Sequence, residues 1–189
     1  SKDLKSNEIF WDPYSLNNNL SSLEGFDCFV HLAGENIASE RWTKRKKDKI
    51  RNSRVLGTKN LCESIVKLVS PPKVFISASA TGIYGNRGEE ELTEDSMFGV
   101  GFLADTGKEW ESATETLKTK NIKVAYLRTG LVLASDGGAL KKMLLPFKLG
   151  LGGVLGNGNQ WMSWISINDH IRAIYFIFEN LLANKIQSG

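Results

Sequence analysis

The sequence predicts a single doubly wound α/β domain with a parallel sheet. Three short apolar runs, at 26–32, 73–79 and 123–128, are continuous rather than alternating. Such runs are typical of parallel strands that are covered on both faces. Two longer segments with helical character, at about 43–68 and 103–118, separate the three runs. Strand and helix alternating in this order predict a parallel sheet with helices packed against it.

Local signals mark where these elements end. The first apolar run stops at Ala33-Gly34, which predicts a tight loop directly after the strand. Pro71-Pro72 stops the first helix, and a turn at Asn121 closes the second.

The C-terminal part predicts further elements. We expect a helix over 139–149, a glycine-rich loop over 150–158 and a short strand over 161–167. A final helix follows, and either Asn168 or Asp169 is expected to cap it. Helical spacing places five of its apolar residues on one face: Ile171, Ile174, Tyr175, Phe178 and Leu182.

Composition favours one compact domain spanning residues 1–189. The chain has 189 residues, of which 41% are hydrophobic, enough for one substantial core. No stretch reaches the roughly 20 apolar residues of a membrane helix, and the first residues lack a secretory signal. We therefore expect a soluble, cytoplasmic protein without a membrane partner.

Two observations argue against a metal site and a nucleic-acid partner. Cys28 and Cys62 lie far apart, without Cys-x-x-Cys spacing or a nearby histidine pair, so neither a metal site nor a disulfide framework is expected. A basic run covers residues 41–54, but at helical spacing its charges spread around the helix. With Trp42 as the one nearby aromatic and a net charge of +3, a solvated face is favoured over nucleic-acid binding.

The glycine pattern bears on nucleotide binding. A Rossmann-like sheet normally begins with a strand, a glycine fingerprint and a helix that holds a pyrophosphate, and none of these precedes His31. The cluster at 150–156 has the wrong spacing and follows a helical segment, so it is not such a fingerprint. We expect this chain to lack the first strand, glycine loop and helix, and to be a fragment at both ends.

Four segments in order resemble the extended short-chain dehydrogenase/reductase family of nucleotide-sugar epimerases and dehydratases. They are VHLAG at 30–34, LGTKNL at 56–61, SASATGIYG at 77–85 and LRTG at 127–130. Further segments resemble an epimerase-like subfamily of which some members carry a legacy cell-division-inhibitor label: WDP at 11–13, AGENI at 33–37, FLA at 102–104, WE at 110–111 and MLLPFKLGLGG at 143–153. The resemblance runs from about residue 11 to residue 182.

The resemblance implies a Rossmann-like fold, a dinucleotide cofactor and a small-molecule substrate. It favours NADP(H) and leaves NAD(H) open, because the segment that selects the ribose 2′ group precedes the region seen here. It also implies a homodimer that packs through the two helices at about 43–68 and 103–118.

Cofactor contacts are expected at the ends of the predicted strands. Leu32, Ala33, Gly34 and Glu35 follow the first strand at the carboxyl edge, where open α/β sheets bind ligands. A turn with no ligand is the other interpretation of these residues. The resemblance adds four further cofactor contacts: Ser77, Lys108, Arg128 and Gly130.

Catalytic residues are expected after the second strand and on the following helix. In the family that the chain resembles, a hydroxyl at this strand end hydrogen-bonds the reacting oxygen, which favours Ser79 and keeps Thr81. The family places Tyr-x-x-x-Lys on the next helix, and the matching positions here are Ala104 and Lys108. Lys108 is kept as a catalytic residue, whereas the tyrosine is missing. Tyr84 offers another phenol, although the Tyr-Gly of relatives usually packs or lines the site.

Polar and aromatic residues near the glycine-rich loop are candidates for substrate binding. Asn157, Gln160 and Trp164 fall in the region 150–167, which we assign to the substrate side, and Asn36 lies in the loop after the first strand. The leading hypothesis is an NAD(P)-dependent oxidoreductase or epimerase-like protein that acts by hydride transfer on a small, nucleotide-sugar-like substrate. The alternative is a catalytically silent dinucleotide-binding protein with a regulatory or partner-binding role, motivated by Ala104.

Overall fold

The computed structural model describes residues 7–15, 18–154 and 156–186. Its main sheet contains three parallel strands, β1 (Cys28–His31), β2 (Val74–Ala80) and β3 (Lys123–Thr129), in the order β1-β2-β3. All three predicted strands are confirmed. The pairing of β1 ends at His31 opposite Ser77, whereas the pairing of β2 with β3 continues to Ala80 opposite Thr129. The central strand therefore carries its last residues past the end of β1.

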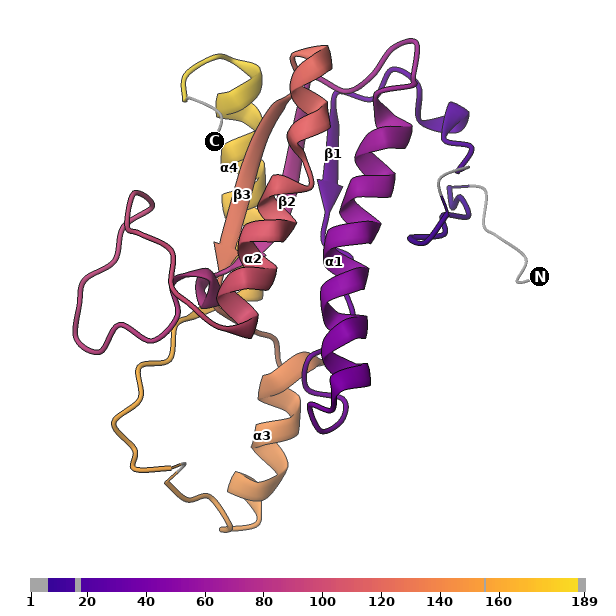
Figure 1. Cartoon of the computed structure of the whole chain (residues 1–189). Helices are drawn as coiled ribbons and strands as arrows, with labels where there is room; N and C mark the ends of the chain where they lie inside the picture. Colours follow the sequence, from indigo (N-terminus) through magenta and orange to yellow (C-terminus); the bar gives the residue numbers. More distant parts are fainter. Residues whose placement is uncertain (1–6, 16–17, 155, 187–189) are drawn as a thin grey trace.

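Helices lie on both faces of this sheet. In Figure 1, α1 (Lys44–Ile65) and α2 (Phe102–Ser112) lie in front of the strands, and α4 (Ile167–Leu182) lies behind them. The result is a Rossmann-like, three-layer α/β arrangement, as the alternation of strand and helix predicts.

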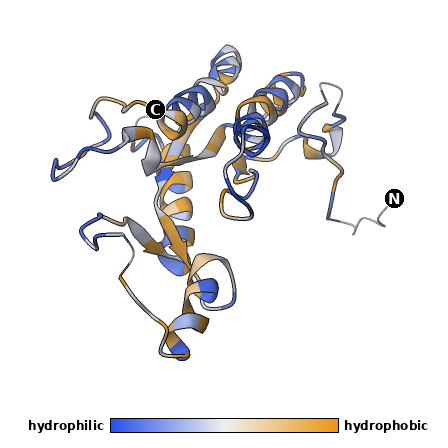
Figure 2. Ribbon diagram, turned by 60° about the horizontal axis from the view of Figure 1, so that its bottom comes forward, coloured by the Kyte–Doolittle hydropathy of each residue, from blue (hydrophilic) through white to orange (hydrophobic). Residues whose placement is uncertain are grey.

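Side chains of β2 alternate between the two faces and join two separate hydrophobic clusters. Phe75 packs on the face of α1, together with Ile65 and Leu117. Val74 and Ile76 point the other way, into a cluster with Leu181 of α4. The continuous apolar run of β2 thus reflects a strand that is buried on both sides. Figure 2 shows bands of both colours along the helices, which combine apolar and polar positions.

The second helix is shorter than predicted. Instead of one helix over 103–118, the chain forms α2 and then a separate 3-10 helix, η3 (Glu115–Lys120). The break occurs at Thr114, whose hydroxyl donates to the carbonyl oxygen of Glu111 at 2.9 Å and also contacts the hydroxyl of Tyr126 at 2.7 Å. A threonine side chain that bonds the backbone in this way competes with continuation of the helix.

The C-terminal part forms a second, smaller sheet. Strand β4 (Leu131–Leu133), which the sequence does not predict, pairs in parallel with β5 (Trp164–Ser166), and α3 (Gly138–Lys148) lies between them in the chain. The predicted strand over 161–167 is thus reduced to three residues. Among the described residues, no helix is long and apolar enough to cross a membrane, and no group of three or more His, Cys, Asp or Glu side chains is placed to hold a metal ion.

The predicted cap and apolar face of the last helix are both corrected. Ser166, not Asn168 or Asp169, caps α4, because the helix begins directly after β5 and the Ser166 hydroxyl accepts from the backbone N–H of Asp169. The face toward the sheet consists of Ile174, Ile177, Phe178 and Leu181. Tyr175 is 64% exposed, and Ile171 and Leu182 are also exposed.

A buried polar network joins β1 to both front helices. His31 is 5% exposed, and its Nε2 lies 2.9 Å from the hydroxyl of Thr58 on α1. Trp110 of α2 donates its indole N–H to the same hydroxyl at 2.9 Å, and Trp11 packs edge-on against the imidazole. The indole can only donate, so the Thr58 oxygen keeps its own O–H and a second lone pair for the contact with the His31 ring. Burial accordingly lowers the pKa of His31 to about 4.

This shift predicts a loss of stability in acid. An unfolded histidine takes up its proton near pH 6.5, so the contribution of His31 is complete above that pH and is lost as the pH falls toward 4. The shift in the pKa of His31 corresponds to a contribution of about 3 kcal/mol to the free energy of unfolding. Urea unfolding at pH 7 and at pH 4 should show a fall in unfolding free energy that is larger by about this amount in the wild type than in His31→Gln. The matched control, His170→Gln, should keep the wild-type dependence, and the same dependence in His31→Gln would contradict the assignment.

Candidate active site

A pocket of about 790 Å³ lies at the carboxyl ends of β2 and β3. The 3-10 helix η2 (Thr81–Tyr84), which directly follows β2, forms one side, and β3 with Gly130 forms another. Residues 92–95 contribute from a long loop, residues 163–165 from β5 and its approach, and His170 and Ala173 from α4. Parallel sheets bind ligands at this edge, so the pocket is the candidate active site.

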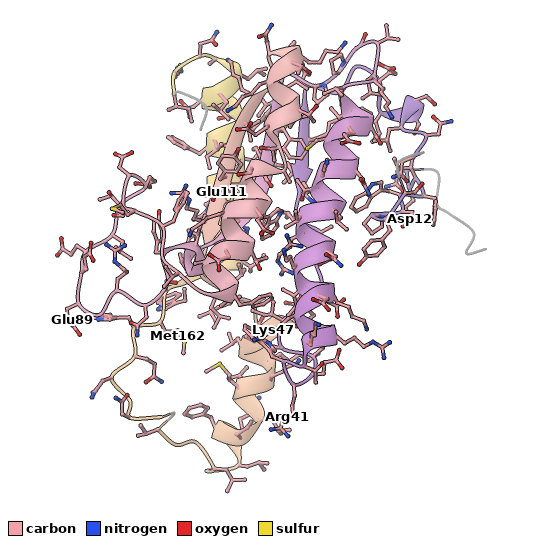
Figure 3. All side chains as sticks on the ribbon, in the orientation of Figure 1. Asp12, Arg41, Lys47, Glu89, Glu111 and Met162 are labelled. Carbon is pink, nitrogen blue, oxygen red and sulfur yellow. The ribbon has the colours of Figure 1, made fainter. Side chains whose placement is uncertain are left out.

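A buried carboxylate holds the strands together beside this pocket. Glu111 of α2 accepts two parallel hydrogen bonds from Arg128 of β3, from Nε to Oε1 and from Nη2 to Oε2, both at 2.9 Å. Its Oε1 also accepts the hydroxyl of Ser79 of β2 at 2.6 Å. The Arg128 and Glu111 side chains are only 18% and 9% exposed. Figure 3 labels Glu111 beside α2. We call Glu111, Arg128 and Ser79 the carboxylate clamp.

The clamp leaves the other side of Arg128 to hold two pocket residues. Its Nη1 donates to the hydroxyl of Tyr84 at 2.9 Å and to the carbonyl oxygen of Glu94 at 2.8 Å. The guanidinium also lies over the rings of Tyr84 and Phe98. Hydrogen bonding to Glu111 raises the pKa of Arg128 above its already high value, so the charge beside Tyr84 is permanent.

Tyr84 and Thr81 bring hydroxyl groups to the pocket. Tyr84 is 7% exposed, and its oxygen accepts from Arg128, while the described residues give its O–H no acceptor. Thr81 and Ser163 place their hydroxyl oxygens 3.1 Å apart on the same lining. A phenol with an available proton next to a fixed cation is an arrangement suited to proton transfer.

The loop after β1 lies at the carboxyl end of that strand and is exposed. Leu32, Ala33 and Gly34 are all exposed. The following residue, Glu35, is anchored to α1: its carboxylate pairs with Lys46 at 2.6 Å, and its backbone bonds Ser53 and Arg54. The hydrogen bond from Lys46 also lowers the pKa of Glu35. The loop is thereby held in place while its strand-end residues stay exposed.

Five of the residues proposed from the sequence lie together on the pocket: Thr81, Tyr84, Arg128, Gly130 and Trp164. Gly130 also has a packing role, because a Cβ there would lie 2.4 Å from the hydroxyl oxygen of Ser163. Region 150–167 reaches the pocket only through residues 163–165.

The other proposed residues lie off the lining. Ser77 is fully buried in the sheet and donates to the carbonyl oxygen of Ala78, and Ser79 is held in the clamp. Lys108 pairs with Asp105 at 3.4 Å on α2. Asn36, Asn157 and Gln160 lie in exposed loops.

Two residues of α2, Leu103 and Gly107, pack against η2. A Cβ at Gly107 would lie 3.1 Å from Ile83, and Leu103 lies 3.6 Å from a Cβ built on Gly82. Leu103 and Gly107 are one helical turn apart, and neither carries a group that can transfer a proton. Ala104 lies one residue around the helix and is buried.

Sequence reasoning missed several functional residues. Glu111 falls within the quoted WE segment, but its role depends on partners 17 and 32 residues away in the chain. Ser163, Glu94, Asp95 and His170 line the pocket from three separate segments. Of these residues, only Glu94 and Asp95 could have been suspected from the sequence, because they are adjacent acidic residues in the segment that follows the strand-end motif at 77–85.

Comparison with known proteins finds similarity to the epimerase family. Residues 10–103 match the model of the NAD dependent epimerase/dehydratase family. An epimerase family protein of Mycobacterium bovis is 39% identical over 171 residues, which cover 90% of this chain and 56% of that protein. The chain thus spans little more than half the length of this relative.

Two solved structures resemble the fold closely. A nucleoside-diphosphate sugar epimerase from Corynebacterium glutamicum is 41% identical with a TM-score of 0.78, over 92% of this chain and 36% of that one. A human epimerase family protein, solved with NADPH, is 34% identical with a TM-score of 0.78, over 85% of this chain and 54% of that one.

The carboxylate clamp should contribute strongly to stability. Glu111→Gln leaves the largely buried Arg128 cation without its paired charge, which should lower the free energy of unfolding by about 3 kcal/mol. Arg128→Met should cost a similar amount. The double variant should cost clearly less than the sum of the two, because it leaves no unpaired charge.

Urea unfolding measures all three variants. Arg172→Met removes an exposed pair with Asp169 and serves as the matched control, with an expected change below about 0.5 kcal/mol. Strictly additive losses at Glu111 and Arg128 would show that the two side chains do not act as a pair.

Proposed function

We propose that this chain, whose residues 10–103 match the NAD dependent epimerase/dehydratase family, belongs to that family and forms the core of an NAD(P)-dependent, epimerase-like oxidoreductase. The enzyme acts by hydride transfer at a hydroxyl-bearing or carbonyl carbon of a small substrate. The observation that carries this proposal is the placement of the Tyr84 phenol and the Thr81 hydroxyl in a pocket at the carboxyl ends of the strands.

The loop after β1 fits a dinucleotide. Leu32, Ala33 and Gly34 are exposed, the small Ala33 and Gly34 leave room for a nucleotide, and the anchored Glu35 keeps the loop in place. The nicotinamide, when bound, supplies or accepts the hydride. The NADPH of the human neighbour favours NADP(H), while the family description keeps NAD(H) open. Lys108 remains a proposed ribose contact from the outer side of α2.

Tyr84 is the proton-transfer group in this proposal. The α2 positions that match the family pair carry Ala104 and Lys108, whereas Tyr84 of η2 brings a phenol to the pocket. In the reducing direction, Tyr84 gives its proton to the substrate oxygen, and the Arg128 guanidinium stabilises the phenolate that forms. Oxidation returns the proton to Tyr84. Thr81 hydrogen-bonds the same substrate oxygen and helps to orient it.

Ser79 acts indirectly. Its hydroxyl is given to Glu111, so it positions Arg128 and, through Arg128, the phenol. Substitution of Ser79 should therefore change the rate through the geometry of Tyr84.

A second candidate is a dinucleotide-binding protein without turnover. It is favoured by the lack of a phenol among the α2 positions at Leu103, Ala104, Gly107 and Lys108. Both candidates require dinucleotide binding, and they differ in whether Tyr84 supports a reaction.

Titration of the complete protein tests the part that both candidates share. NADPH and NADH are added separately, and quenching of the tryptophan fluorescence is followed. We expect saturable binding, tighter for NADPH. Adenosine monophosphate serves as the control ligand and should bind at least tenfold more weakly, because it lacks the nicotinamide half. Failure to bind either dinucleotide would remove both candidates.

Replacement of Tyr84 separates the candidates. Tyr84→Phe should lower kcat by about 10²- to 10⁴-fold, because the proton donor is lost. Dinucleotide affinity should stay within about twofold of the wild type, since Tyr84 does not line the β1 loop. Tyr175→Phe, at an exposed phenol on α4, should leave kcat unchanged. Full turnover in Tyr84→Phe would exclude Tyr84 as the acid, and binding without any turnover in the wild type would favour the silent candidate.

A further inference from the structure

Some of the charged side chains on the pocket wall have an ion-pair partner and others have none among the described residues. Four charged or readily ionised side chains line it: Glu94, Asp95, Arg128 and His170. In the described part of the chain, no cation lies within ion-pair distance of the Glu94 or Asp95 carboxylate. Both residues are exposed on the long loop, on its pocket side. The wall therefore presents two carboxylates without partner cations.

Arg128 does not offset these carboxylates. The Glu111 carboxylate neutralises the Arg128 guanidinium and accepts two of its hydrogen bonds. The Nη1 group of Arg128 donates its two N–H groups to the Tyr84 hydroxyl and to the Glu94 carbonyl oxygen. Four of the five N–H groups of the guanidinium are thus in use. An incoming carboxylate or phosphate finds no fork of free donors here, which is the geometry that arginine needs to bind an anion.

The remaining lining suits an uncharged, hydroxyl-rich ring. Thr81, Thr129 and Ser163 bring hydroxyl groups that both donate and accept. Trp164, which is 64% exposed, offers an indole surface on β5 against which the apolar face of a ring can pack. The Glu94 and Asp95 carboxylates accept hydrogen bonds from hydroxyl or ammonium groups.

We infer that this pocket binds an uncharged or amino-substituted polyhydroxylated ring and discriminates against one that carries a carboxylate or phosphate. The inference rests on the proposed function for the role of the pocket. It adds that the reacting ring of the substrate is not acidic. Any anionic part of the substrate must lie outside this pocket.

Three ligands that share one ring and carry a neutral, a positive or a negative charge test the inference. Methyl β-D-glucopyranoside, D-glucosamine and D-glucuronate share one ring and most hydroxyl groups. Their dissociation constants for the complete protein are measured by NMR chemical-shift perturbation at pH 7, where the glucosamine amine is protonated and glucuronate is ionised, with and without NADPH. We expect the glucoside and glucosamine to bind and glucuronate to bind at least about tenfold more weakly.

Removing the two carboxylates should largely abolish the discrimination against glucuronate. In the double variant Glu94→Gln/Asp95→Asn, the ratio of the glucuronate to the glucoside dissociation constant should fall to about threefold or less. The backbone carbonyl of Glu94 remains in place for Arg128. The matched control, Glu89→Gln/Glu91→Gln, removes two charges from the same loop outside the pocket, at the outer side where Figure 3 shows Glu89, and should keep the wild-type ratio.

Each outcome bears on one proposal. Glucuronate binding as tightly as the glucoside, or none of the three sugars binding, would overturn the inference. A control variant that changes the ratio as much as the pocket variant would also overturn it, since the effect would then be general charge. If the sugars discriminate as expected but neither dinucleotide binds, the proposed function fails and the inference about the pocket stands.

Discussion

The candidate site depends on one buried carboxylate. Glu111 neutralises Arg128 and accepts the hydroxyl of Ser79, so a single side chain of α2 fixes the ends of β2 and β3. A buried charge without a partner is costly, and the geometry that satisfies both ions leaves little freedom to the guanidinium. Because that guanidinium then holds Tyr84 and the carbonyl of Glu94, the phenol and the acidic loop are positioned by the same clamp. Structure and proposed chemistry thus share one set of contacts.

A second polar network holds the end of β1 and the loop that follows it. His31 ends β1 and bonds Thr58, which Trp110 also bonds, and the guanidinium of Arg54 lies over the ring of Trp110. Arg54 in turn holds the backbone of Glu35 in the loop after β1. Trp110 and Glu111 are neighbours on α2, so this helix anchors both the proposed cofactor loop and the proposed catalytic residues. The proposed hydride transfer needs those two regions in a fixed relation, which a shared rigid helix provides.

Much of the fold could be predicted because its strands leave a strong local signal. The run around Phe75 is apolar without interruption since helices cover both of its faces, and Pro71-Pro72 and Gly34 mark the ends of elements by their backbone limits. The sequence does not predict an element's existence or its end where these depend on contacts between residues far apart in the chain. Thr114 ends α2 by bonding Glu111 and Tyr126, and the strand at Leu131–Leu133 exists only through its pairing with β5. In the site, Thr81, Tyr84 and Arg128 were proposed because their strand-end segments resemble the family, whereas Glu111 required knowledge of which side chains meet across three elements.

The central claim is that Tyr84, held by the clamp, faces the reacting carbon of the bound substrate and cofactor. A crystal structure of the complete protein with NADPH tests it most directly. The account predicts that the nicotinamide ring lies between the Leu32–Gly34 backbone and the pocket, with its reactive edge toward Tyr84 and Thr81 and with the Glu111–Arg128 pair intact. A nicotinamide placed against Lys108 and away from Tyr84, or no dinucleotide at this edge of the sheet, would contradict it.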